Sequence, residues 1–286
     1  MLAPRRIAFV NEKGGSAKTT LVANFAAYLA LRRGRRVLAI DMDPQGHLGK
    51  SLGLDTRGAA RSAIDLLLDH AFGDPGLDRS PHPVRPGDPP DGLPIVRSRI
   101  AGVDVVVANK ALGLFPAWQD DGDGDPTGRL AGSLAGRPEL RRYDFVFFDA
   151  PPSFGPLTLN VLRAAEEIVI PVPLTYLALD GCAELARTLT TVRRRYGHSR
   201  LRIAMVVPTF YRHTRLAQEI LEALKRRFPK EIAQTVVGYH VRIDEAQSRG
   251  LSIFEHAPQD RGAKVMAELA EELELRAAPP AWEGET

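Results

Sequence analysis

The residues with the clearest chemical signature are residues 11–20, which read Asn-Glu-Lys-Gly-Gly-Ser-Ala-Lys-Thr-Thr. An apolar run at residues 6–10 precedes them, and apolar residues recur at helical spacing after them. This context predicts a strand, a glycine-containing loop and a helix. The first amides of a helix lack intrahelical partners and carry partial positive charge, which suits phosphate oxygens. The stretch therefore predicts a site for the phosphates of a nucleoside triphosphate.

The loop itself is expected to bind through its backbone. Gly14, Gly15, Ser16 and Ala17 are predicted to turn their N–H groups toward the phosphates, because glycine leaves room for close approach. The alternative is a glycine-rich turn between a strand and a helix, with its lysines simply solvated. The motifs described below make that alternative the weaker one.

Three side chains at the start of the predicted helix have separate tasks. Lys18 is expected to reach the β and γ phosphates as a point charge. Thr19 would place its hydroxyl on Mg²⁺, and Thr20 would donate to the α phosphate. Each task requires that type of residue, so the spacing indicates a magnesium–nucleotide site.

The loop departs from the ordinary phosphate-loop pattern, G-x-x-x-x-G-K-[ST], because Glu12 and Ala17 stand at its two glycine positions. It resembles the deviant Walker A motif, K-G-G-x-G-K-[ST], of the ParA/MinD family of ATPases, whose early lysine is Lys13 here. The resemblance extends from residue 7 to about residue 273. It implies that Lys13 reaches the nucleotide bound by a second protomer, and that both lysines stabilise the charge that develops during hydrolysis.

Acidic residues follow two further apolar segments. Asp41 and Asp43 come at the end of residues 36–43, and Asp149 ends the apolar run at residues 143–149. Ligands of open α/β sheets bind at the carboxyl ends of the strands, so these carboxylates are expected to face the nucleotide. The family resemblance implies that Asp43 orients the attacking water, that Asp41 lies near the water shell of magnesium, and that Asp149 holds Mg²⁺ through water.

The composition suits a single globular unit. The chain has 286 residues, of which 44% are hydrophobic, and this is ample for one α/β domain. We expect a mostly parallel twisted sheet flanked by helices, a P-loop NTPase fold of the deviant Walker A type, over residues 1–276. Gly34 is predicted to end the first helix. Three more elements are predicted before Asp149: a helix at 62–72, a strand at 103–107 and a helix at 129–141.

Two segments are predicted to be irregular, exposed insertions. Residues 73–94 are rich in proline, and residues 119–128 are rich in aspartate and glycine. The acidic segment has the spacing of a weak calcium loop, but no glutamate follows at the required distance, so a flexible turn is favoured. A flexible tail is expected at residues 277–286.

Later segments extend the resemblance. Residues 168–172 with 178–181 are similar to the strand and helix start that meet the dimer partner in the family. Residues 241–250 are similar to the segment that closes over the base, with Pro208 as a possible adenine contact. Gln247 stands where the family usually has proline. We expect that Gln247 does not touch the chemistry directly.

Positive charge is modest overall, with a net charge of +3, but it is concentrated. The arginines that we singled out as candidate DNA contacts are Arg193, Arg194, Arg195, Arg212 and Arg215. Phosphate contacts need only Lys and Arg on one face, which would suit DNA without sequence preference. Such a cluster is also typical of a solvated surface.

The resemblance implies a magnesium-dependent ATP hydrolase that forms an ATP-dependent homodimer and binds double-stranded DNA non-specifically. A ParB-like centromere-binding partner would trigger hydrolysis, and the cycle would segregate or position chromosomal or plasmid DNA. The implied cofactors are ATP and Mg²⁺. The protein is expected in the cytoplasm, on the nucleoid when ATP is bound, and away from membranes, since no run of residues reaches the length and hydropathy of a span.

Three alternatives were weighed. A MinD-like membrane-cycling ATPase shares the loop but carries a basic amphipathic C-terminal helix, whereas residues 268–286 here are rich in glutamate. A metal-cluster scaffold needs paired cysteines, and the chain has only Cys182, which also suits a reducing compartment. A metabolic P-loop kinase or ligase stays open and would require a small acceptor substrate.

Overall fold

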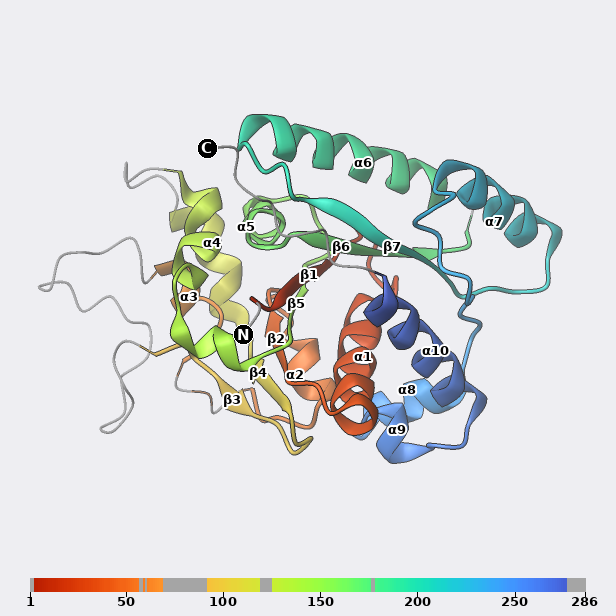
Figure 1. The fold of residues 1–286 in the computed structure, drawn as a ribbon, viewed down its shortest axis with the longest axis horizontal. Coiled ribbons are helices and arrows are strands. Elements are labelled where there is room, and N and C mark those ends of the chain that lie inside the picture. The colour runs from red at the N-terminus through yellow and green to blue at the C-terminus, as the bar shows by residue number, and fades with distance from the viewer. Residues whose placement is uncertain are drawn as a thin grey trace, which may run out of the picture.

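The fold is built on one sheet of seven strands, in the order β3-β4-β2-β5-β1-β6-β7 (Figure 1). The computed structural model describes residues 3–56, 59, 61–68, 92–118, 125–175 and 178–276. Six strands are parallel: β1 Arg5–Phe9, β2 Val37–Asp41, β4 Val103–Val106, β5 Phe145–Asp149, β6 Glu167–Pro173 and β7 Arg202–Thr209. The short edge strand β3, Val96–Arg97, is antiparallel to β4. The predicted mostly parallel sheet is confirmed.

The central strands are apolar on both faces because helices cover both. In β1, Ile7 and Phe9 belong to one hydrophobic core, and Ala8 and Val10, just after the strand, belong to the other. Successive side chains of a strand point to opposite faces, so a strand between two cores must be apolar throughout. All residues of β2, β5 and β6 are buried for the same reason.

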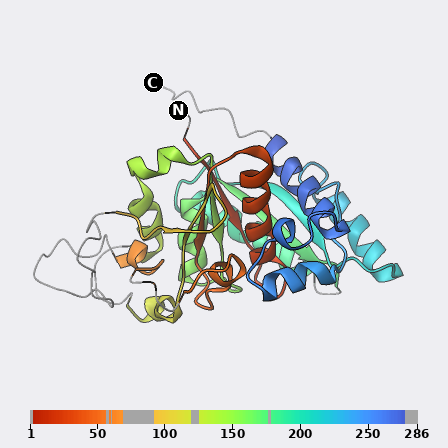
Figure 2. The same ribbon diagram turned by 90° about the horizontal axis from the view of Figure 1, so that it is seen from below.

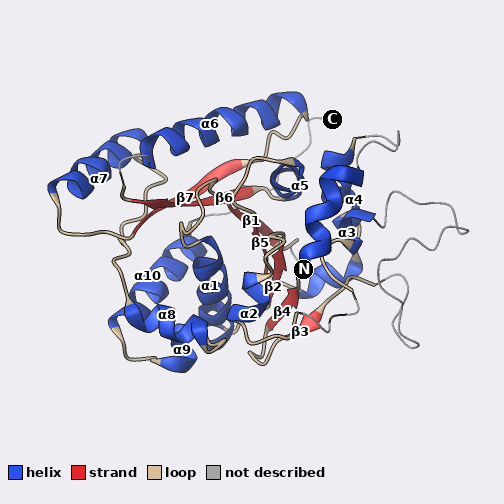
Figure 3. Cartoon of the chain, turned by 180° about the vertical axis from the view of Figure 1, so that it is seen from behind, coloured by secondary structure: helices blue, strands red, loops and turns tan. Residues whose placement is uncertain are grey.

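Two helical layers enclose the sheet, and Figure 3 shows the strands between them. One layer holds α1 Lys18–Arg33, α2 His47–Ser51, α8 Val241–Ser248, α9 Ile253–His256 and α10 Arg261–Leu275. The other holds α3 Asp65–Leu68, α4 Arg129–Leu134, α5 Pro156–Ala164, α6 Ala178–Arg195 and α7 Arg215–Arg227. Figure 2 shows α1 in red beside the blue C-terminal helices, against which it packs. None of the helices in the described ranges is long and apolar enough to span a bilayer.

The predicted helix boundaries are partly right. Gly34, with φ of 64°, caps α1 after Arg33 as expected. The helix predicted at 129–141 was wrong: α4 ends at Leu134, and a separate 3₁₀ turn, η3, covers Pro138–Arg142. The break follows from Gly136, which has φ of 69°, and from Pro138, which lacks an N–H for the helical ladder.

Several predicted segments extend beyond the described residues. The helix predicted at 62–72 starts later, as α3 at Asp65, and residues beyond 68 lie outside the described part. The strand predicted at 103–107 is confirmed as β4. Of the proline-rich segment, residues 73–91 lie outside the described residues, as do 119–124 of the acidic segment and the predicted tail at 277–286. Two further 3₁₀ turns lie at the acidic segment: η1 Lys110–Trp118 precedes it, and η2 Pro126–Gly128 forms its end.

Candidate functional site

The predicted strand–loop–helix arrangement is present at the middle of the sheet. Residues 11–17 connect β1 to α1, which begins at Lys18. The first hydrogen bond of the helix runs from Leu21 N to Ala17 O, at 2.9 Å. The amides of residues 18–20 therefore precede the helical ladder and are free to meet an anion. Gly14 and Gly15 are exposed beside them, so the loop is open to a ligand.

The loop contains one strained residue. Ala17 has φ of 77° and ψ of 20°, the left-handed conformation that favours glycine. A Cβ in this conformation costs about 1–2 kcal/mol. Gly15 is also left-handed, with φ of 67°, but carries no such cost.

The two lysines of the motif lie in different environments. Lys18 is 7% exposed, and its Nζ donates to Asn11 O at 2.9 Å, beneath the loop. Burial lowers the pKa of Lys18, while the nearby Asp149 and Asp43 raise it. Lys13 is exposed, and its Nζ donates to Thr175 Oγ1 at 2.9 Å, just after β6. Lys18 is thus directed into its own loop, and Lys13 lies at its outer surface.

Two buried carboxylates stand beside Lys18. Asp41 and Asp149 are paired residues at the ends of neighbouring strands and are 0% and 1% exposed. Asp41 accepts hydrogen bonds from Asp43 N at 3.0 Å and from Leu48 N at 3.1 Å. Thr19 Oγ1 donates to Asp149 Oδ2 at 2.6 Å. The structure therefore brings the predicted metal residues Thr19, Asp41 and Asp149 to one edge of the sheet.

This group has the features of a cation site. Burial raises the pKa of Asp41 and of Asp149, because two carboxylates in the interior are poorly solvated. Asp149 Oδ1 is buried and has no hydrogen-bond partner among the described residues. An oxygen donor set of carboxylates and a hydroxyl suits Mg²⁺, which also keeps water and phosphate ligands. Among the described residues, no group of three or more His, Cys, Asp or Glu is placed to hold a metal ion by itself.

Asp43 lies in the turn that links β2 to α2. It is half-buried, and its Oδ1 accepts from Gln45 N at 3.0 Å. Gly46 closes the turn by donating its N–H to Asp43 O at 2.9 Å. A Cβ on Gly46 would lie 2.7 Å from Ala108 O, so only glycine fits there. The carboxylate of Asp43 lies close enough to Lys18 to raise the pKa of its ammonium.

Gln247 makes a contact that the sequence did not reveal. Its Oε1 accepts a hydrogen bond from Thr20 Oγ1 at 3.2 Å, so α8 contacts the first turn of α1. That Gln247 does not touch the chemistry stays a prediction. Asn24 adds a second link that the sequence did not reveal. It is 1% exposed, its Nδ2 donates to Thr20 O at 2.8 Å, and its Oδ1 accepts from Ile253 N at 2.9 Å. A polar residue at a buried helix position was the only signal available for Asn24.

Pro208 is a buried residue near the end of β7. Its neighbour Thr209 donates through Oγ1 to Ser16 O at 3.4 Å, so this end of β7 lies against the phosphate loop. Ser16 is itself 1% exposed. Contact between Pro208 and an adenine ring stays a prediction.

The five candidate DNA-binding arginines form two groups. Arg193, Arg194 and Arg195 are exposed in the last turn of α6, before β7 begins. Arg212 and Arg215 are exposed after β7 ends. A strand of this length spans about 25 Å, so the two groups lie at opposite ends of β7. Within one chain they do not make a single patch.

Comparison with known proteins gives the site its context. A match to the CobQ/CobB/MinD/ParA nucleotide binding domain covers residues 7–253. The chain belongs to this family. The resemblance predicted from the deviant Walker A motif is therefore confirmed.

The relatives within the CobQ/CobB/MinD/ParA family include partitioning ATPases. The chain is 39% identical to the chromosome-partitioning ATPase Soj of Thermus thermophilus, over 95% of this chain and 96% of that protein. It is 30% identical to the sporulation initiation inhibitor protein Soj of Bacillus subtilis, over 93% and 97%. Among solved structures, it is similar to cobyrinic acid a,c-diamide synthase from Mycobacterium smegmatis with bound ADP and magnesium, with a TM-score of 0.72, 28% identity, and coverage of 94% and 93%.

The strain at Ala17 can be tested by substitution. We expect Ala17→Gly to stabilise the protein by about 0.5–1 kcal/mol, because relief of the left-handed strain exceeds the entropy that glycine adds to the unfolded chain. Chemical denaturation measures this change. Gly15→Ala should destabilise by a similar amount, and Gly14→Ala, whose φ is not left-handed and whose Cβ would meet nothing within 4 Å, is the control. A destabilised Ala17→Gly variant would contradict the inference that the left-handed backbone at Ala17 is strained.

Proposed function

We propose that this protein is a ParA-type ATPase that hydrolyses ATP with Mg²⁺. The observation that carries the proposal is the meeting of Lys18, Thr19 and Asp149 at the ends of β1 and β5, where Thr19 Oγ1 lies 2.6 Å from Asp149 Oδ2. This is the arrangement that a magnesium–nucleotide complex requires. Family membership and the partitioning ATPases among the relatives support it.

The residues present divide the chemistry among them. Mg²⁺ would neutralise charge on the phosphates, and Thr19, Asp41 and Asp149 would hold it, the carboxylates directly or through water. Lys18 would donate to the phosphates in place of its present acceptor, the carbonyl of Asn11. Asp43 would accept a hydrogen bond from the attacking water and so orient it for in-line attack.

The exposed position of Lys13 supports a role in dimerisation. Its ammonium is hydrogen-bonded to the hydroxyl of Thr175 at the surface, whereas the ammonium of Lys18 lies under the loop. We infer that two protomers close face to face around two ATP molecules and that Lys13 of each contacts the phosphates held by the other. ATP would then act as the signal for dimerisation.

The basic groups suggest the partner of that dimer. We propose that the dimer binds double-stranded DNA without sequence preference through the exposed arginines Arg193, Arg194, Arg195, Arg212 and Arg215. Because the two groups lie at opposite ends of β7, each would contact a separate stretch of phosphates. A ParB-like centromere-binding protein would stimulate hydrolysis, and the cycle would segregate or position chromosomal or plasmid DNA. The nucleoid-bound, cytoplasmic location follows from that cycle.

The position of α10 disfavours a MinD-like membrane cycle. A membrane-binding helix needs a free apolar face. The apolar face of α10 is buried in the core that it shares with α1, with Met266, Leu269, Ala270 and Leu273 almost fully covered. The basic and apolar surface that lipids would bind is therefore missing from this helix.

The proposed cycle predicts a specific pattern of stimulation. ATP turnover should be slow alone, little changed by non-specific DNA, and raised by DNA together with a ParB-like protein encoded beside this gene. Phosphate release measured under each condition checks this. Turnover that requires a small acceptor molecule instead would indicate a metabolic kinase or ligase.

The trans role of Lys13 has its own test. Lys13→Ala should still bind ATP as a monomer, because Lys18 and the loop amides are intact, but it should not form the ATP-dependent dimer. Light scattering with and without a slowly hydrolysed ATP analogue measures dimer formation. Lys264→Ala, which removes an exposed lysine of α10, is the matched control. Unchanged dimerisation of the Lys13 variant would exclude the trans role.

The role of Asp43 is tested by the lifetime of the dimer. Asp43→Ala should reduce hydrolysis by about 10²-fold or more, because water loses its orienting acceptor, while ATP binding and the DNA-bound dimer persist. Single-turnover hydrolysis and DNA dissociation rates measure the two effects. Asp144→Ala, at the opposite end of β5, serves as the control. Normal turnover in the Asp43 variant would show that this residue is misassigned.

A further inference from the structure

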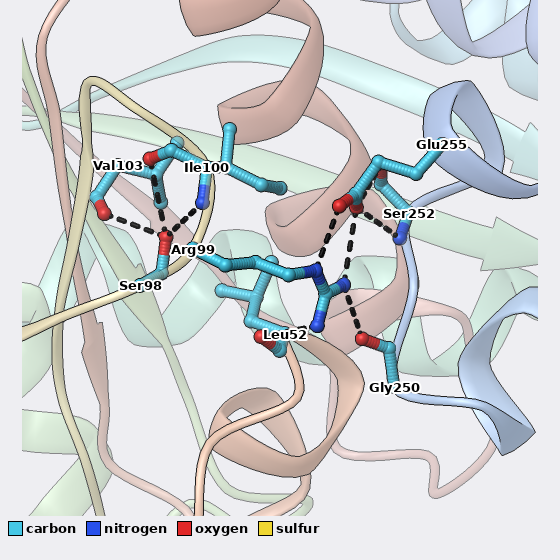
Figure 4. Close-up of polar contacts among 8 residues, drawn as sticks. All are labelled: Leu52, Ser98, Arg99, Ile100, Val103, Gly250, Ser252 and Glu255. Carbon is cyan, nitrogen blue, oxygen red and sulfur yellow. Dashed lines mark hydrogen bonds and ion pairs between the residues drawn. The ribbon is translucent and has the colours of Figure 1, made fainter.

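One arginine outside the nucleotide site joins three distant segments of the chain. Arg99 lies in the turn between β3 and β4 (Figure 4), and its Nε donates to Glu255 Oε1 at 2.7 Å. Its Nη2 donates to Glu255 Oε2 at 3.2 Å and to the carbonyl of Gly250, and its Nη1 donates to Leu52 O at 3.3 Å. The guanidinium therefore holds the end of α2 and the α8–α9 turn together.

The groups around Arg99 are themselves fixed. Glu255 Oε2 also accepts from Ser252 N at 2.9 Å and from Ser252 Oγ at 2.8 Å, as part of the capping box of α9. On the other side, Ser98 Oγ accepts from Ile100 N at 3.1 Å and donates to Val103 O at 2.7 Å, which closes the turn that carries Arg99. Arg99 thus connects two turns that are each held by hydrogen bonds of their own.

The two joined turns touch through their backbones. Gly53 and Gly250 both have left-handed φ values, 71° and 64°. A Cβ on Gly250 would lie 2.9 Å from Gly53 Cα and 2.9 Å from Lys50 O. Only glycine permits this approach at Gly250. Arg99 lies across the contact and bonds a carbonyl on each side of it.

The turn at Leu52 and Gly53 is joined through α2 to the segment that carries Asp43. Helix α2 has five residues, so its two ends are only about 7 Å apart. At its start, Leu48 N donates to Asp41 Oδ2 at 3.1 Å, and Asp43 lies in the connection between β2 and α2. Lys50 Nζ also donates to Gln45 O at 2.9 Å, which ties the helix to the same loop. These hydrogen bonds connect the helix that ends at Leu52 to the turn that carries Asp43.

The turn between α8 and α9 is joined to the helix that follows the phosphate loop. Gln247 accepts from Thr20, and Ile253 N donates to Asn24 Oδ1, so the α8–α9 segment is attached to the first two turns of α1. Together these contacts form a continuous path from Thr20, through α8 and Arg99, to α2 and the turn that carries Asp43. In this path, the side chain of Arg99 joins the end of α2 to the turn between α8 and α9.

We propose that Arg99 is a positioning residue for ATP hydrolysis: it fixes α2 against the α8–α9 turn and so holds Asp43 in register with the phosphate loop. This inference rests on the proposed function. An ion pair as exposed as Arg99–Glu255, with side chains 37% and 23% exposed, contributes little to stability, so the geometric constraint is its main effect. The planar fork of arginine makes these bonds simultaneously, which lysine cannot do.

The test separates turnover from binding and from folding. We expect Arg99→Ala and Arg99→Lys to lower kcat by about tenfold, with ATP affinity within about twofold of the wild type. Glu255→Gln keeps the capping box but removes the charged partner, and it should lower kcat in the same direction. Arg97→Ala, which removes an exposed arginine two residues earlier, is the matched control. In the nucleotide-free protein, the amides of Leu48 and Leu52 should exchange about tenfold faster in the Arg99 variants.

The outcomes distinguish the inference from the proposed function. Equal kcat in the wild type and in both Arg99 variants would overturn the positioning role, even if thermal unfolding shifted. A parallel loss of ATP affinity would also overturn it. If the wild type hydrolysed no ATP under any condition, the proposed function would fail, and unchanged exchange at Leu48 would then decide against the positioning role separately. If Arg99→Ala did not fold, Arg99→Lys and Glu255→Gln would provide the same comparison.

Discussion

The site depends on two carboxylates that the sheet forces together in its interior. Asp41 and Asp149 are paired across β2 and β5, and both are almost fully buried. Burial leaves both carboxylates poorly solvated, which raises their pKa values, and the charge of Asp149 raises the pKa of Asp41 further. The nearby ammonium of Lys18 opposes the rise in the pKa of Asp149. A cation beside these two carboxylates would favour their ionised forms, which makes the arrangement suitable for a magnesium–nucleotide complex.

Parallel strands explain why these groups meet although they are far apart in sequence. Strands that run in the same direction end at the same edge, so each strand delivers the residue that follows its apolar run to one place. Strand β1 delivers the phosphate loop, β2 the Asp43 turn and β5 Asp149. The apolar cores on both faces hold the strands in register, and a shift of one residue in β5 would move Asp149 away from Asp41.

The sequence predicted what is local and missed what is distant. The phosphate loop, the buried carboxylates and the stop at Gly34 follow from neighbouring residue types, and the structure contains each of them. The contacts of Gln247 and Arg99 join residues 227 and 156 positions apart, and no periodicity or motif reports such pairs. The break at Gly136 was missed because helical periodicity outweighed a single glycine in the prediction.

The hydrogen bond between Lys13 and Thr175 has a consequence for how readily the lysine changes partners. Its acceptor is a neutral hydroxyl at the surface. A bond from the ammonium to a phosphate oxygen joins two opposite charges, whereas the bond to Thr175 joins the ammonium to a neutral hydroxyl, so a phosphate would bind this ammonium more strongly. Because the lysine is exposed, added salt would weaken its attraction to a phosphate. Exchange of the ammonium from Thr175 to a phosphate would therefore be favoured by the anion and opposed by ionic strength.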